Sequence, residues 1–237
     1  MVVDWLDVAK AGAWGGLLAL ERRAFLQAML SRPLVAATGM GLLLGEPETG
    51  LYIGMLLELF HLGSAALGAA LPENETLAAT GTTAAAACMA TGEGGGGTAA
   101  LWAVALLLFA ALGVVGRRVD RRLEGVSARL ADRALELTDA GELERAVRLH
   151  GYGPWPYVLA FGLLTAACAL AGFLLSPVVY ALPLAALRGL AWAFPAMACV
   201  AAALAARSSH AQRGGLWATL AGSAVVLCML AYAWVQR

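Results

Sequence analysis

Ionisable residues interrupt an apolar, glycine-rich stretch of the chain between residues 20 and 75. Glu58 lies near the middle of the apolar run 49–71, and His61 follows it in the same run. A charged side chain in the middle of a bilayer costs about 2.5–3.5 kcal/mol on insertion scales, which marks such a carboxylate as a functional hypothesis. The candidate binding residues of this stretch are Arg32, Glu46, Glu58, His61, Glu73 and Asn74.

These residue types suit a neutral, polyhydroxylated solute such as a sugar. A carboxylate accepts hydrogen bonds from neighbouring hydroxyl groups, while asparagine and histidine add further donors and acceptors. Tyr52, Phe60 and several tryptophans offer aromatic faces for a sugar ring. Two other interpretations of Glu58 stay open. It pairs with a helix N-terminus or with a basic residue such as Arg32, or it carries a proton in a coupled transporter.

The elements that carry these residues are those of a membrane protein. The chain is 61% hydrophobic and 14% charged, against about half and a quarter in soluble domains, and its net charge of zero gives no indication of nucleic acid. A straight span needs about 20 apolar residues. The expected spans are 1–20, 33–45, 49–71, 76–92, 99–116, 154–175, 189–206 and 214–235.

The first four of these segments are short, weakly apolar or interrupted by glycine. Such segments are typical of substrate sites in transporters, so we expect broken or re-entrant helices in the N-terminal third of an all-α, polytopic helical bundle. The expected division is an N-terminal transmembrane region at 1–116, a cytoplasmic amphipathic segment at 117–150 and C-terminal transmembrane helices at 151–237. A short interfacial helix is expected at 177–188, where two prolines and an arginine occur.

The segment 117–150 holds 8 of the 16 basic residues, interleaved with 7 acidic ones. Apolar residues recur in it at steps of three and four, which predicts an amphipathic helix, and Asp139 with Glu142 resembles a capping box opening a second helix. The segment is either a solvated loop or a docking surface for a soluble partner. With the expected spans, 13 of the 16 basic residues fall on one side, which the positive-inside rule makes cytoplasmic.

Other motifs in the chain indicate no metal or cofactor chemistry. The four cysteines lie far apart in apolar runs, so they are expected to be small buried hydrophobic residues, not metal ligands. The glycine-rich run 91–98 lacks the lysine of a phosphate-binding loop and is expected to be a turn. Asp4 and Asp7 precede Lys10, an order that does not fit a secretory signal peptide.

A longer pattern in the N-terminal region extends over about 45 residues. It runs through Arg32-Pro33, Gly45-Glu46, Thr49-Gly50, Gly54, Glu58, Leu62-Gly63, Gly68 and Pro72-Glu73. This pattern resembles the signature of the IIC subunit of the mannose/fructose/sorbose family of the bacterial phosphotransferase system (PTS). The family more often has aspartate where this chain has Glu46 and Glu73, and two prolines where it has Leu71-Pro72. Beyond residue 92 the resemblance is one of layout.

The resemblance implies group translocation in the bacterial inner membrane. With a IID membrane subunit, a IIC chain holds the sugar and presents a hydroxyl to a soluble IIB protein, whose phosphohistidine donates a phosphoryl group within a phosphoenolpyruvate-dependent relay that includes IIA. The chain itself then needs no cofactor and carries no phosphoryl group, and its histidines, His61, His150 and His210, lie in no soluble domain. The alternatives are an ion- or proton-coupled transporter and a divergent, non-transporting scaffold or sensor.

Overall fold

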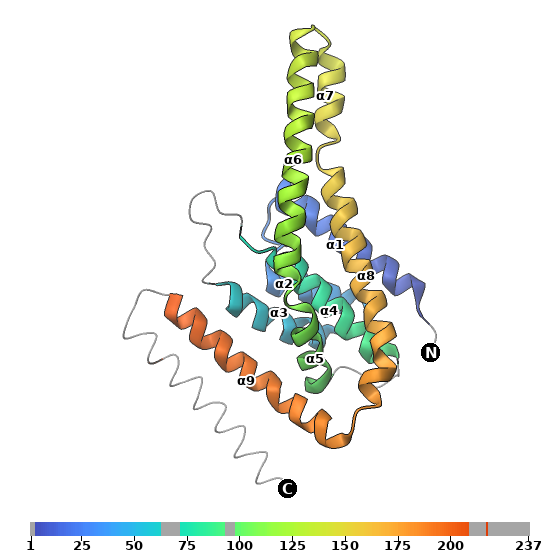
Figure 1. The fold of residues 1–237 in the computed structure, drawn as a ribbon, viewed down its shortest axis with the longest axis vertical. Coiled ribbons are helices and arrows are strands. Elements are labelled where there is room, and N and C mark those ends of the chain that lie inside the picture. Colours follow the sequence, from blue (N-terminus) through green and yellow to red (C-terminus); the bar gives the residue numbers. More distant parts are fainter. Residues whose placement is uncertain (1–2, 63–71, 93–97, 209–216, 218–237) are drawn as a thin grey trace.

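The computed structural model describes residues 3–62, 72–92, 98–208 and 217 of the 237-residue chain. In this part the chain forms a helical bundle from which a two-helix hairpin projects (Figure 1). The helices are α1 (Trp5–Arg23), α2 (Pro33–Leu43), α3 (Pro47–His61), α4 (Glu75–Gly92), α5 (Ala99–Phe109), α6 (Leu112–Asp139), α7 (Leu143–Gly151), α8 (Trp155–Tyr180) and α9 (Leu184–Ser208). The all-α expectation is thereby confirmed. The predicted span 214–235 and most of the glycine-rich run lie outside the described residues.

Helix α4 is the centre of the bundle, although its sequence predicts only a weak span. Every residue from 76 to 90 is buried, and the helix packs against α1, α2, α3, α5, α6 and α8. Its many alanine, threonine and glycine residues explain the burial of α4, because small residues let helices approach closely. They also explain its low hydropathy, because a helix enclosed by protein needs no apolar surface for lipid. The low hydropathy of this segment therefore reflects its central position.

Small residues also set the contact between α1 and α8. A Cβ atom added to Gly162 would lie 2.9 Å from the carbonyl oxygen of Gly12, and one added to Gly15 would collide with the side chain of Thr165. On the other side of α8, a Cβ on Gly172 would collide with the backbone of Ala85 in α4. The helices α1, α8 and α4 thus pack with backbone close to backbone, as small residues allow in membrane proteins.

Within the described residues, three helical stretches are long and apolar enough to cross a membrane: Ala99–Asp139, Leu143–Tyr180 and Leu184–Ala205. The first joins α5 and α6 across a two-residue break, and the second joins α7 and α8. The predicted interfacial helix at 177–188 is wrong. Pro177 is inside α8, which continues to Tyr180, and α9 begins at Leu184.

The charged segment forms the projecting hairpin of α6 and α7 (Figure 1). Helix α6 runs without interruption from its apolar beginning into the charged region, so the predicted division at 116/117 falls inside one helix. The predicted capping box is wrong: Asp139 ends α6, and Glu142 precedes α7 without a capping hydrogen bond from its side chain. Gly141, at φ +78°, makes the turn between them, in a conformation that glycine adopts readily.

Helices α2 and α3 form a short antiparallel hairpin. Each begins with a proline, Pro33 and Pro47, at the first helical position, where the missing N–H costs nothing. Gly45, at φ +77°, turns the chain between them. With 11 residues, α2 is about 16 Å long, roughly half the thickness of the hydrocarbon core. This hairpin of two short helices is the kind of broken element that was expected in the N-terminal third; its position in the membrane stays a prediction.

Candidate functional site

The base of the α2–α3 hairpin carries an ion pair between two predicted site residues. The guanidinium of Arg32, which precedes α2, donates a hydrogen bond to one carboxylate oxygen of Glu58 near the end of α3, and the other oxygen accepts the backbone N–H of Leu34 at 3.2 Å. The Arg32 side chain is 44% exposed and that of Glu58 is 18% exposed. Of the interpretations of Glu58, pairing with Arg32 is therefore the arrangement in the structure.

His61 lies one turn beyond Glu58, in the last turn of α3. Its Nδ1 atom is 2.8 Å from the carbonyl oxygen of Leu57, which places a proton on this nitrogen as the donor. The imidazole is therefore oriented by its own helix. Arg32, Glu58 and His61 share the base of the hairpin and form the first group of candidate residues.

Glu46 lies at the opposite end of α3, at the tip of the hairpin. From Glu46 to Glu58 the chain advances 12 residues, or about 18 Å along a helix. The two carboxylates therefore do not meet in one binding site. Thr49 donates a hydrogen bond to Glu46 at 3.2 Å, and the indole N–H of Trp102 in α5 donates to the Thr49 hydroxyl at 3.0 Å. The buried Trp102 thus orients the Thr49 hydroxyl, which in turn orients the Glu46 carboxylate.

The same tryptophan belongs to an aromatic cluster. Its ring stacks on Tyr52 with centroids 4.6 Å apart, and Phe194 of α9 meets both rings edge-on. Tyr52 is 39% exposed, whereas the other two rings are buried. Part of Tyr52 thus remains exposed, between Glu46 and Glu58 along α3, and Tyr52 was among the residues expected to offer an aromatic face.

Glu73 and Asn74 are separate from the hairpin and precede α4. Glu73 is half-exposed and lies 4.0 Å from Arg117. Asn74 is buried, and its Oδ1 accepts the N–H of Leu77 at 2.9 Å, which caps α4. Its Nδ2 donates to Asp120 of α6 at 2.9 Å. In this conformation both the acceptor and the donor group of the Asn74 side chain make hydrogen bonds that stabilise the fold.

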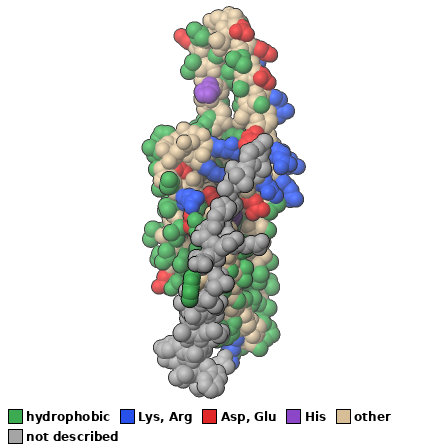
Figure 2. Space-filling view, turned by 90° about the vertical axis from the view of Figure 1, so that its left-hand side faces the viewer, with side chains coloured by type: hydrophobic (Ala, Val, Ile, Leu, Met, Phe, Trp, Pro, Cys, Tyr) green, Lys and Arg blue, Asp and Glu red, His purple; other side chains and the backbone are tan. Residues whose placement is uncertain are grey.

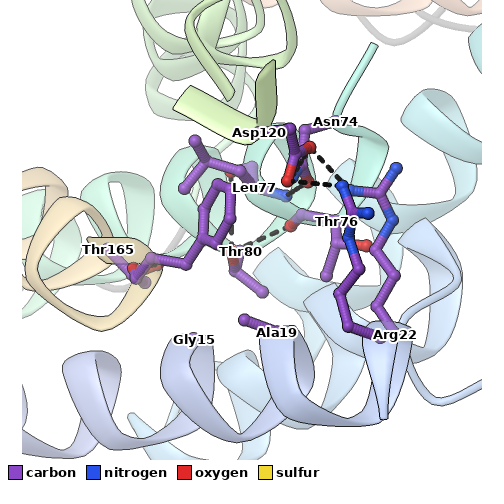
Figure 3. Close-up of a pocket in the computed structure, with 11 residues that line it drawn as sticks. Gly15, Ala19, Arg22, Asn74, Thr76, Leu77, Thr80, Asp120 and Thr165 are labelled. Carbon is purple, nitrogen blue, oxygen red and sulfur yellow. Dashed lines mark hydrogen bonds and ion pairs between the residues drawn. The ribbon is translucent and has the colours of Figure 1, made fainter. Parts of the chain in front are cut away.

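Asp120 is the centre of a buried polar cluster that joins three helices (Figure 3). Besides Asn74, its carboxylate meets Arg22 at 3.2 Å and Arg23 at 3.0 Å, both from the end of α1. Arg23 also pairs with Glu124 and lies over the ring of Tyr157. Burial opposes the charge of Arg23, but these carboxylates outweigh it and raise the pKa of the guanidinium above its ordinary value.

A small cavity lies beside this cluster, between α1, α4, α6 and α8, and is shown in Figure 3. Thr76, Thr80 and Thr165 line it together with Asn74 and Asp120. Its volume is about 10 Å³, roughly the space of one water molecule. A sugar does not fit there, so the cluster has a structural role in this conformation.

The cluster also places the basic segments relative to one another. Arg22 and Arg23 of the first basic loop meet Asp120 and Glu124 of the segment 117–150. These contacts agree with the prediction that the two segments lie on one side of the membrane. Figure 2 shows basic side chains, which at this level are arginines, gathered where the hairpin leaves the bundle, with hydrophobic side chains below. By the positive-inside rule, this is the end that we expect to face the cytoplasm.

Two buried carboxylates were missed by sequence reasoning: Asp120, in the cluster, and Glu21, which accepts the backbone N–H groups of Leu30 and Ser31. For Trp102, only an aromatic face was expected and not its hydrogen bond to Thr49. Asp120 lies in a run of arginines, where an acidic residue is expected to pair with its neighbours on the same helix. Glu21 had a usable signal, since an acidic residue in the last turn of a helix is unfavourable without a specific partner. Of the cysteines, Cys88 and Cys168 are free and buried, as expected for small hydrophobic residues. Cys228 lies outside the described part.

Comparison with known families decides the assignment of the chain. The family described as the sorbose-specific IIC component of the PTS matches residues 6–230 of this chain. The chain belongs to this family. The predicted resemblance is thereby confirmed, and it extends well beyond the N-terminal motif. All six candidate residues of this IIC chain lie inside the matched range.

Relatives of this IIC chain agree with the assignment. The sorbose-specific EIIC component of Lacticaseibacillus casei is 49% identical over 49 residues, and this stretch makes up 21% of the chain but only 18% of that relative's length. A solved structure titled as a membrane protein has a TM-score of 0.68 at 18% identity, and one of the mannose transporter ManYZ with microcin E492 has 0.61 at 19%. Each covers 100% of this chain and 97% of the other. At these identities the likeness establishes the fold.

Proposed function

We propose that this chain is the sugar-translocating IIC subunit of a phosphoenolpyruvate-dependent, mannose-type PTS in a bacterial inner membrane. It would bind the sugar within the membrane and present a hydroxyl to a soluble IIB protein, with a IID membrane subunit and a soluble IIA protein completing the system. Family membership over residues 6–230 supports the IIC assignment, and the shared fold with a mannose transporter supports transport.

The observation that carries the binding proposal is the Arg32–Glu58 ion pair at the base of a re-entrant hairpin. Each Glu58 oxygen already holds one hydrogen bond, from Arg32 and from the N–H of Leu34, and keeps lone pairs for further donors. The pair is partly exposed, so a sugar hydroxyl has access to it. Arg32 fixes the orientation of the carboxylate, while His61 adds a polar group one turn away. This group forms the inner part of the proposed site.

The remaining predicted residues contribute at other places along the path. Glu46 lies about 18 Å from Glu58 along α3, and we assign it to the entry side at the hairpin tip. Tyr52 lies between them and is partly exposed, and we assign its ring to stacking against the sugar. Glu73 and Asn74 border the polar cluster at the cytoplasmic end, and a sugar would reach them only after a change of conformation.

The main alternative is a proton-coupled transporter that acts alone. In the structure both Glu58 oxygens are already bonded, one by Arg32 and the other by the N–H of Leu34, and both keep lone pairs for hydroxyl donors. Together with membership in a IIC family of the PTS, this arrangement favours group translocation.

Sugar uptake by Glu58→Gln tests the proposal. The complete complex is placed in vesicles with IIA, IIB and phosphoenolpyruvate, and accumulation of the sugar phosphate is measured across candidate hexoses. We expect Glu58→Gln to reduce uptake by at least about 100-fold, because the amide loses the charge that Arg32 and the sugar hydroxyls share. Glu144→Gln, an exposed glutamate on the projecting hairpin, is the matched control and keeps wild-type uptake.

Two results would contradict the proposal. Wild-type uptake by an inserted Glu58→Gln protein would remove Glu58 from the site. Uptake by the wild-type chain that follows a pH gradient, without a phosphoryl donor and without a phosphorylated product, would replace group translocation by proton coupling.

A further inference from the structure

The loop from residue 24 to 31, between α1 and α2, has a strained backbone. Leu26, Gln27 and Met29 have φ values of +63°, +46° and +63°, in the left-handed region that non-glycine residues rarely adopt. The side chains of residues 24–30 are exposed, so burial of this loop does not explain its conformation. Some other interaction must hold the backbone in place.

That interaction comes from Glu21, a buried carboxylate in the last turn of α1. One of its oxygens accepts the backbone N–H of Leu30 at 3.2 Å, and the other accepts that of Ser31 at 3.0 Å. The Glu21 side chain is only 3% exposed, so these two N–H groups replace the water that would otherwise solvate it. Charge-assisted hydrogen bonds of this kind are about twice as strong as neutral ones.

A second contact holds the same end of the loop from another helix. The hydroxyl of Thr76 in α4 donates to the carbonyl oxygen of Ser31 at 2.8 Å. The peptide groups on both sides of Ser31 are thus fixed, one by α1 and the other by α4. The next residue is Arg32, whose side chain bonds Glu58.

We propose that Glu21 is a positioning residue that holds Arg32, and through it Glu58, in the geometry that binds substrate. It acts through two backbone N–H groups and touches no substrate itself. The inference deepens the proposed function, because it explains what fixes the ion pair at the base of the α2–α3 hairpin. Without the carboxylate, the left-handed residues relax toward ordinary conformations, and Arg32 leaves its place before α2.

Two measurements test this inference independently of each other. The first is limited chymotrypsin digestion of the full chain purified in detergent, because Phe25, Leu26 and Met29 are exposed on the loop. We expect Glu21→Ala to raise the rate of cleavage in this loop by at least about tenfold, since two hydrogen bonds of a charged group are lost. Glu21→Gln, which keeps one acceptor, is expected to lie between Glu21→Ala and the wild type.

The second measurement is the concentration dependence of sugar uptake by the assembled complex. Glu21→Ala is expected to raise KM by about tenfold, in step with the digestion rate, because a misplaced Arg32 weakens binding. Adding Leu26→Asn and Met29→Asn should restore part of the KM and of the rate of cleavage after Phe25, a site that these variants keep, since asparagine tolerates the left-handed region and both side chains are exposed. A loss of general stability would not be rescued in this way. Glu144→Gln again serves as the matched control.

The outcomes separate the two proposals. If wild-type vesicles take up no hexose, the proposed function fails, while the digestion rates still test whether Glu21 holds the loop 24–31. Unchanged digestion and unchanged KM in Glu21→Ala would overturn the inference. So would accelerated digestion that the asparagine variants leave unaltered, since Glu21 would then not act through the left-handed residues.

Discussion

Replacing Gly41 with alanine tests whether α2 and α3 must touch through their backbones. A Cβ atom at this position would lie 2.5 Å from the carbonyl oxygen of Glu46 and 2.9 Å from both the nitrogen and the Cα of Gly50. All of these atoms belong to the backbone, so no side chain can rotate away. Gly125 in α6 offers the opposite case, because a Cβ there would meet nothing within 4 Å.

The size of the effect follows from the same geometry. Ordinary van der Waals contact begins at 3.4 Å, so at Gly41 the two chains must separate by 3.4 − 2.5, or about 0.9 Å. Overpacking of this kind costs about 3 kcal/mol where the neighbours cannot move, while alanine gains about 1 kcal/mol over glycine in a helix. We therefore expect Gly41→Ala to lose about 2 kcal/mol and Gly125→Ala to gain about 1 kcal/mol.

Thermal unfolding of the purified chain in detergent measures both variants. For a protein of this length, these energies correspond to a Tm about 4–8 °C lower for Gly41→Ala and about 2–4 °C higher for Gly125→Ala. Separation of the hairpin also stretches the hydrogen bond from the N–H of Glu46 to the Gly41 carbonyl, which is 2.8 Å long. Sugar uptake should therefore fall in Gly41→Ala and stay at the wild-type level in Gly125→Ala.

A Gly41→Ala protein that is as stable as the Gly125→Ala protein would refute this reasoning. That result would mean that the backbones of α2 and α3 lie farther apart at Gly41 than in the structure, so that the glycine is not needed for a close contact.

Two further substitutions address the buried networks. Asp120→Ala leaves two arginines without their shared partner, so we expect a loss of stability of about 3–5 kcal/mol in thermal unfolding. Glu136→Ala, which breaks an exposed ion pair, is the control and should lose less than about 1 kcal/mol. Equal losses would show that the cluster contributes nothing beyond a surface pair. Trp102→Phe keeps an aromatic ring but removes the donor to Thr49, so we expect a loss of about 1 kcal/mol and weaker sugar binding, and unchanged affinity would separate Glu46 from binding.

Sequence reasoning predicted the fold where the signal was local. The apolar runs 33–45, 99–116, 154–175 and 189–206 correspond to α2, to α5 with the start of α6, to α8 and to α9, and each is recognised from neighbouring residues only. It failed at Pro177, which an apolar helix accommodates in its last turn, where only one carbonyl loses its partner. Sequence reasoning also took α4 for a weak span, because a high hydropathy is needed only where a helix faces lipid, whereas α4 is enclosed by other helices.

The candidate site was predicted in part, for a related reason. The sequence pointed to Arg32 and Glu58, but the choice between ion pair, proton carrier and sugar ligand required their distance in space. One stretch of sequence suggested one cluster of six residues, whereas helix geometry separates Glu46 from Glu58 by about 18 Å. Asp120 and Asn74 are 46 residues apart, and nothing in the order of the chain indicates that they meet.

The uninterrupted course of α6 has a mechanical consequence. Its 28 residues make a stiff rod about 42 Å long, with Leu112 in the bundle and Asp139 at the far end of the projecting hairpin. Gly116 packs directly on Asn74, and Asp120 forms an ion pair with Arg22 at the end of α1, so the rod is anchored in its first third. A displacement of the free end is therefore transmitted along the stiff helix to Asn74, the capping residue of the central helix α4.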